Sequence, residues 1–198
     1  MNETFAILAG IGLAAACGFR IFLPLFIASM AVRAGIDGVA GFELASLLGE
    51  DLAWVGSTPA IITLGVATVL EIGGYYVPWL DNALDTIATP AALVAGTLVA
   101  FALFPGGNQA IDWALAAIAG GGTAGLIQSG SVALRGASTA TTGGLGNFAV
   151  ATLELLGSLL GSVLTIFLPM LAGGLALLLA FFVLVKVAKR LARRRAEA

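Results

Sequence analysis

Residues 146–188 read GNFAVATLELLGSLLGSVLTIFLPMLAGGLALLLAFFVLVKVA, and this stretch decides the class of fold. Glu154 and Lys186 are its only charged residues. An α-helix crosses the hydrocarbon core of a bilayer with about 20 mainly apolar residues. Pro169 and the pair Gly173-Gly174 interrupt the stretch. We therefore predict one membrane span over 146–166 and a last span over 170–188.

The composition of the whole chain indicates the same class. Of its 198 residues, 60% are hydrophobic and 10% are charged, and the mean hydropathy is +1.06. Soluble domains carry about 25% charged residues, so a soluble enzyme, a nucleic-acid-binding protein and a disordered chain are excluded. The chain has no His and a single Cys, Cys17, which excludes a structural zinc site, a Ser-His-Asp triad and an internal disulfide. We expect no enzyme activity and no cofactor.

Four further apolar segments precede this stretch. In the first, residues 4–33, the apolar run is interrupted by Gly18, Arg20 and Pro24, which favours a broken or re-entrant helix. We predict an all-α, polytopic helical membrane protein of about six membrane segments. The three remaining spans are predicted over 58–77, 88–104 and 110–127.

Two polar stretches lie between these segments. Residues 34–56 hold four acidic side chains and indicate a loop. Residues 120–147 are rich in Gly, Ser and Thr and contain Arg135. They are too polar for a lipid-facing helix and too apolar for a free linker, so we expect a second broken or re-entrant helix near Arg135.

The chain ends in a basic tail, residues 189–198. Six of the nine basic side chains lie within 186–198. A basic segment directly after an apolar helix marks the cytoplasmic side of a membrane. With six segments the N-terminus would also be cytoplasmic, and the 34–56 loop would lie outside.

The two halves of the chain, 1–107 and 108–188, share a pattern. In each half an Arg follows an Ala-Gly pair at the same interval, ending at Arg20 and at Arg135. Each half also has one Glu within a span, Glu71 or Glu154, with a Gly three residues later. Because each half has three membrane segments, the second copy would be inverted. Inverted repeats are a mark of secondary transporters, whose binding sites lie near the midplane.

Charged side chains in membrane segments are rare and mark functional sites by default, at a cost of about 2.5–3.5 kcal/mol each. Two interpretations stay open for those in this chain. The Arg and Glu side chains could pair as structural locks. Alternatively, they line a polar cavity in which carboxylates bind a cation or proton, and Arg compensates charge or binds an anionic group. The candidate ion- or substrate-binding residues are Glu71, Glu154, Arg20, Arg135, Asp81 and Asp85.

The residues around the end of the 58–77 span suggest two further roles. Asp81 and Asp85 are four residues apart and share a face if helical. They either cap the third span or form a vestibule that attracts cations. Tyr75, Tyr76 and Trp79 are typical of an interfacial aromatic belt.

The run Gly18-Phe19-Arg20 with Pro24-Leu25, followed by Glu71, Pro78, Asp81, Asp85 and Pro90, resembles a bacterial membrane family. That family is catalogued as domain of unknown function 4126, and the resemblance covers about residues 5–185. It implies a location in the bacterial inner membrane. Many members carry an Asp just after the Glu, where this chain has Gly74 and Tyr75, which implies a different mode of binding if that acid holds a cation. No activity comes with the resemblance.

The sequence favours a small secondary transporter, coupled to a cation or proton through Glu71 and Glu154. The first alternative is a phospholipid or polyprenyl-phosphate flippase, in which Arg20 and Arg135 bind phosphate. The second is an ion channel lined by 128–142, and the third is a non-transporting scaffold. The expected partners are the lipid bilayer, a small ion, solute or lipid head group, and a second copy packed through small residues.

Overall fold

A computed structural model describes residues 3–36, 54–77, 80–104 and 106–197, and every regular element with an assigned range in it is helical. The all-α prediction is confirmed for these residues, whereas most of the predicted 34–56 loop lies outside them. The elements are α1 (Glu3–Cys17), α2 (Phe22–Ala34), α4 (Thr58–Tyr75), α5 (Leu80–Leu103), α6 (Gln109–Leu115), η3 (Ala116–Gly121), α7 (Gly122–Thr142), α8 (Asn147–Phe167) and α9 (Pro169–Glu197).

Five helical stretches of the described chain are long and apolar enough to cross a membrane. They make the chain a multi-pass membrane protein and confirm that part of the prediction. Helices α1 and α2 are apolar but shorter, with 15 and 13 residues. The five long stretches are Thr58–Tyr75, Ala83–Leu103, Gln109–Thr142, Asn147–Phe167 and Pro169–Lys189.

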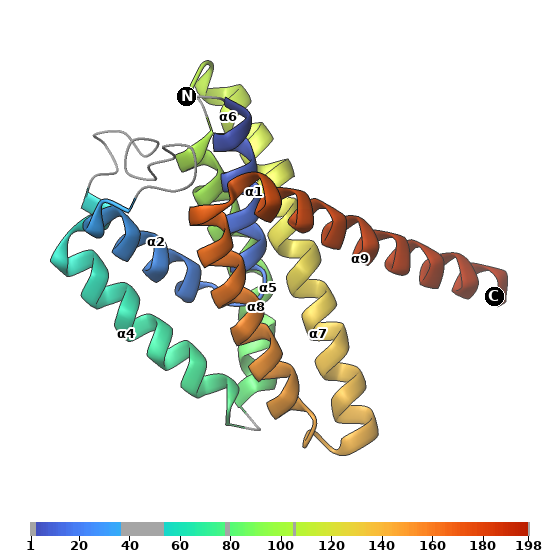
Figure 1. Cartoon of the computed structure of the whole chain (residues 1–198). Helices are drawn as coiled ribbons and strands as arrows, with labels where there is room; N and C mark the ends of the chain where they lie inside the picture. Colours follow the sequence, from blue (N-terminus) through green and yellow to red (C-terminus); the bar gives the residue numbers. More distant parts are fainter. Residues whose placement is uncertain (1–2, 37–53, 78–79, 105, 198) are drawn as a thin grey trace.

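Helices α1 and α2 form a hairpin, as Figure 1 shows. The chain breaks between Cys17 and Phe22, where Gly18 and Arg20 predicted an interruption. At about 1.5 Å per residue, α1 is about 22 Å long, which is less than the roughly 30 Å hydrocarbon core. The turn of the hairpin reaches the inside of the bundle, because the Arg20 side chain donates a hydrogen bond to the carbonyl oxygen of Ala151 in α8.

The outer ends of the hairpin lie on one side of the bundle. Phe5 of α1 and Ile36, just after α2, pack against the same apolar core cluster. Arg33, near the end of α2, donates a hydrogen bond to Thr58 at the start of α4. Because the chain turns back at residues 18–21, the start of α1 and the end of α2 lie toward the same end of the bundle in Figure 1, which argues against the expectation that the N-terminus and the 34–56 loop lie on opposite sides.

Helices α6, η3 and α7 follow one another without a break over Gln109–Thr142. The expected end of a span at residue 127 and the broken helix near Arg135 are therefore wrong. The polar side chains are compatible with a helix because their hydroxyl groups hydrogen-bond within it. Ser129 donates to the Gly125 carbonyl oxygen at 2.7 Å, and Thr142 donates to that of Ser138 at 2.8 Å.

Small residues bring the long helices into close contact. A Cβ atom built on Gly120 of η3 would overlap the Cβ atom of Ala100 and the carbonyl oxygen of Gly96, both in α5. Gly12 of α1 and Gly173 of α9 form a similar crossing. These contacts rely on glycine, because any added side-chain atom would push the two helices apart.

Helix α9 crosses α1 and α7, and its C-terminal part extends away from the other helices (Figure 1). Its buried residues in the described part are Pro169, Ala172, Gly173, Ala176 and Ala180. The predicted basic tail, 189–198, continues this helix as far as Glu197.

The close contact of η3 with α5 can be tested by Gly120→Ala. We expect the free energy of unfolding to fall by about 1–3 kcal/mol, as in other overpacked cores. Gly122→Ala is the matched control, because nothing lies within 4 Å of a Cβ atom there, and its effect should stay within about 1 kcal/mol. Thermal unfolding in detergent measures both variants. Equal losses of unfolding free energy would contradict the claim that Gly120 is in close contact with α5.

Candidate functional site

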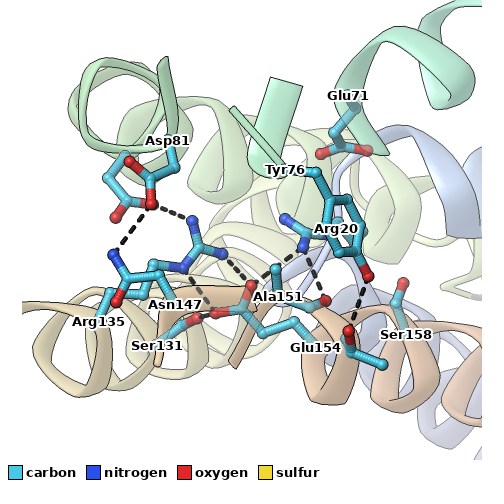
Figure 2. Close-up of polar contacts among 12 residues, drawn as sticks. Arg20, Glu71, Tyr76, Asp81, Ser131, Arg135, Asn147, Ala151, Glu154 and Ser158 are labelled. Atoms are coloured by element: carbon cyan, nitrogen blue, oxygen red, sulfur yellow. Dashed lines mark hydrogen bonds and ion pairs between the residues drawn. The ribbon is translucent and has the colours of Figure 1, made fainter. Parts of the chain in front are cut away.

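Five charged side chains meet inside the described bundle, and we call them the charged cluster (Figure 2). Their exposed fractions range from 1% for Arg20 to 8% for Asp85. Isolated charges are too costly to bury, so each needs a partner. The cluster joins the hairpin turn to three other helices. Its members are Arg20 from that turn, Asp81 and Asp85 from α5, Arg135 from α7 and Glu154 from α8.

Glu154 is the centre of the charged cluster. Its Oε2 atom lies 3.3 Å from the Nη2 atom of Arg20 and also forms an ion pair with Nη2 of Arg135. Its Oε1 atom accepts hydrogen bonds from the Nε atom of Arg135, at 3.2 Å, and from the Ser131 hydroxyl group. One carboxylate therefore holds two guanidinium groups, one from the hairpin turn and one from α7.

The polar contacts continue from Arg135 toward the C-terminal end of α7 and the N-terminal end of α5. The Nη1 atom of Arg135 lies 3.1 Å from Oδ1 of Asp85. Asp81 accepts a hydrogen bond of 3.0 Å from the Asn147 side-chain amide, which also donates to Thr139. Asp85 thus forms a buried ion pair, so its role extends beyond that of a helix cap.

Tyr75, at the end of α4, packs against both guanidinium groups. Its ring centroid lies 3.9 Å from the Cζ atom of Arg20 and 4.0 Å from that of Arg135. Such cation–π contacts are strongest in sites shielded from water, and Tyr75 is 5% exposed. The expectation of an interfacial belt residue is wrong for Tyr75, because the end of α4 turns this ring inward. Trp79 lies outside the described residues.

Glu71 has a different environment from Glu154. It lies one helical turn before Tyr75 on α4, and its carboxylate accepts hydrogen bonds from the backbone N–H groups of Ile21, at 2.7 Å, and Phe22, at 3.0 Å. It therefore caps the N-terminus of α2, where the Ile21 side chain has no polar atom to do so. Figure 2 shows Arg20 between Glu71 and the Glu154 side of the charged cluster.

The charged cluster lies between the middle and one end of α7 and α8. Glu154 follows Asn147, the first residue of α8, by seven positions, and Arg135 precedes Thr142, the last residue of α7, by seven. At about 1.5 Å per residue, both lie about 10 Å from these helix ends. The site was expected near the midplane, and Arg135 and Glu154 lie three residues, or about 5 Å, from the middles of α7 and α8.

Three members of the site, Tyr75, Ser131 and Asn147, were not among the candidates from sequence. Tyr75 follows Glu71 by four positions and Asn147 precedes Glu154 by seven. Both intervals place the pair on one helix face, so periodicity relative to the buried Glu residues was the available signal. Tyr75 was instead assigned to the membrane interface.

A charged cluster enclosed by long apolar helices defines the class as a multi-pass helical membrane protein with a polar interior. Within this class, the chain belongs to the family described as Domain of unknown function (DUF4126), whose model matches residues 7–189. The family predicted from sequence is thereby confirmed. No curated protein and no solved structure matches the chain.

The contact of Tyr75 with both guanidinium groups predicts that the ring matters more than the hydroxyl group. Tyr75→Leu should lower the free energy of unfolding by about 2–4 kcal/mol, because each desolvated cation–π contact contributes about 2 kcal/mol. Tyr75→Phe keeps the ring and should lose about 1 kcal/mol. Thermal unfolding in one detergent compares them, and equally unstable variants would show that the ring contacts contribute little.

Proposed function

We propose that the protein is a small secondary transporter coupled to protons, with Glu154 as the coupling group. The observation that supports this most is the shared carboxylate between Arg20 and Arg135. Protonation of Glu154 would remove the negative charge that holds two like charges together. The hairpin turn would then separate from α7, so that proton binding changes which helices are in contact.

A proton suits this cluster better than a metal cation. Glu154 and Asp85 both contact guanidinium groups, which would repel a metal ion at the same oxygen atoms. Arginine stays protonated in proteins, so the exchangeable charge in these ion pairs belongs to the carboxylates. A proton-coupled transporter also needs a group that takes up and releases a proton at membrane depth.

The directions of α4 and α8 support the inverted repeat, although α1, which precedes Arg20, and α7, which contains Arg135, run in the same direction (Figure 1). The hairpin, α4 and α5 would form one unit, and the stretch from α6 to α7, α8 and α9 the other. The first segment of each unit packs on the last helix of the other, since α1 contacts α9 and α5 contacts η3 and α7. Helix α4 ends where α8 begins, with the Tyr76 hydroxyl 2.8 Å from that of Thr152, so the two run in opposite directions. The charged cluster then lies between the units, as in known transporters.

We place the protein in the bacterial inner membrane with the basic tail in the cytoplasm. The hairpin is then re-entrant and five helices cross the membrane, so that the N-terminus lies outside. The C-terminal end of α4 and the connection between α7 and α8 at residues 143–146 face the cytoplasm, and the charged cluster lies about 10 Å from that connection.

The alternatives find less support in these contacts. A flippase needs Arg side chains that reach a lipid phosphate, whereas Arg20 and Arg135 are 1% and 2% exposed and are held by carboxylates. A channel lined by 128–142 needs hydroxyl groups directed into a pore, but Thr141 and Thr142 bond to carbonyl oxygens of their own helix. A scaffold would keep the same ion pairs in every state and would carry no flux.

Proton movement into proteoliposomes tests the proposal, with a pH-sensitive dye inside and gradients of sodium, potassium, chloride and acetate imposed in turn. Wild-type protein should move protons with at least one gradient. Glu154→Gln should reduce that flux at least about tenfold, a change of about 1.4 kcal/mol in the barrier. Glu3→Gln is the control, because Glu3 is an exposed acid at the start of α1.

Fluorescence-detected gel filtration establishes that each variant is folded before its flux is compared. A folded wild-type protein that moves no protons under any gradient would overturn the transporter proposal. Equal flux in wild type and Glu154→Gln would remove Glu154 as the coupling group.

A further inference from the structure

The hairpin turn contains hydrogen-bond donors that lack an acceptor. Arg20 is 1% exposed, and its Nε and Nη1 atoms are buried without a hydrogen-bond partner among the described residues. Its Nη2 atom alone serves Glu154 and the Ala151 carbonyl oxygen. Buried donors are nearly always satisfied, and an unsatisfied one costs about 1–3 kcal/mol. The two free donors of Arg20 therefore indicate a place for an acceptor that is not part of the chain.

Directly after Arg20, the backbone offers further donors. The N–H groups of Ile21 and Phe22 begin the 13-residue helix α2. The N-terminus of a helix attracts negative charge through its free N–H groups and its dipole. The guanidinium group of Arg20 and the N–H groups of Ile21 and Phe22 are donors from adjacent residues. Together they form the positively polarised wall of a candidate binding site, which we call the lining.

A carboxylate already occupies part of this lining. Glu71 reaches it from α4 and accepts the N–H groups of Ile21 and Phe22. Glu71 is partly exposed, unlike the charged cluster, so its side chain has room to leave. The geometry is that of an anion-binding site that is occupied by a carboxylate of the protein itself, Glu71 of the neighbouring helix α4.

We propose that the N–H groups of Ile21 and Phe22 and the guanidinium group of Arg20 bind a small monovalent anion, and that Glu71 is its tethered competitor. When the Glu71 carboxylate takes up a proton from water, it becomes a neutral acid and releases the helix end to the anion. Anion and proton then bind together at Glu71, whereas Glu154 remains the group whose protonation separates the hairpin turn from α7 in the transport step. The inference deepens the proposed function and rests on it for the transport step, since it names the substrate class as an anion that moves with a proton.

The charge of the lining sets the charge of the ligand. It consists of one guanidinium group, already shared with Glu154, and a helix N-terminus equivalent to about half a positive charge. A monovalent anion matches this balance, whereas a divalent anion would keep uncompensated charge in a buried place. The charged and titratable groups that surround Glu71 and Arg20 are Cys17 of α1, Tyr75 and Tyr76 at the end of α4, Asp85 of α5, Arg135 of α7 and Glu154 of α8.

Equilibrium binding of chloride and of acetate tests the site. Titration calorimetry is performed on the full-length protein in detergent, with gluconate as the background anion. At neutral pH, Glu71→Gln should bind at least one of the two anions about tenfold or more tightly than wild type, because the competing charge is gone. Wild-type protein should take up about one proton for each anion bound, which the dependence of the enthalpy on the buffer reveals.

Two further variants show where the anion binds. Arg20→Lys keeps one positive charge but loses the planar set of donors, and it should weaken binding at least about tenfold in the Glu71→Gln background. Arg33→Gln is the control, because Arg33 lies at the other end of α2 and bonds to Thr58, and its affinity should equal that of the parent. If Glu71→Gln does not fold, wild-type binding at acid and neutral pH replaces it, and tighter binding at acid pH is expected.

The outcomes separate this inference from the transporter proposal. Binding of acetate but not chloride, or the reverse, supports the site and identifies its preferred anion. Binding without proton flux supports the site and overturns transport. Proton flux in a protein that binds neither anion, in any variant, supports transport and overturns the site, as does equal affinity in wild type and Glu71→Gln.

Discussion

The contact of Glu154 with both Arg20 and Arg135 is the interaction on which the rest of the described structure depends. It joins the turn of the hairpin to α7 and α8 through a single carboxylate. In a medium of low polarity, such contacts are strong, and the loss of one partner leaves a buried charge that costs about 3–5 kcal/mol. In this structure the turn of the hairpin lies inside an apolar bundle because Glu154 compensates the full positive charge that Arg20 brings with it.

The same turn explains the position of Glu71. A helix that begins inside a membrane protein exposes N–H groups, and each of them must find an acceptor. Glu71 supplies one from α4, while Tyr75, one turn further along, contacts the Arg20 that precedes these N–H groups. The hairpin turn is therefore held by a carboxylate on each side, Glu71 and Glu154, and these two acids perform different tasks despite their similar sequence context.

The sequence predicted the parts of the structure that depend on the rarity of charge. Long apolar runs located α4 and α8 to within a few residues, and Arg20, Arg135 and Glu154 were singled out because charges are costly in a membrane. The continuous helix from Gln109 to Thr142 was missed because its hydroxyl groups bond within their own helix, a local compensation that composition does not reveal. The separate role of Glu71 was missed as well, because it depends on where another helix begins.

A double-mutant cycle between Arg20 and Glu154 tests this account most directly. Unfolding free energies in one detergent or bilayer would be measured for wild type, Arg20→Gln, Glu154→Gln and the double variant. The account predicts that the double variant loses less than the sum of the single variants, by at least about 1 kcal/mol, because each single change strands a charge that the other would remove. Losses that add to within about 0.5 kcal/mol would contradict the claim that this ion pair holds the hairpin in place.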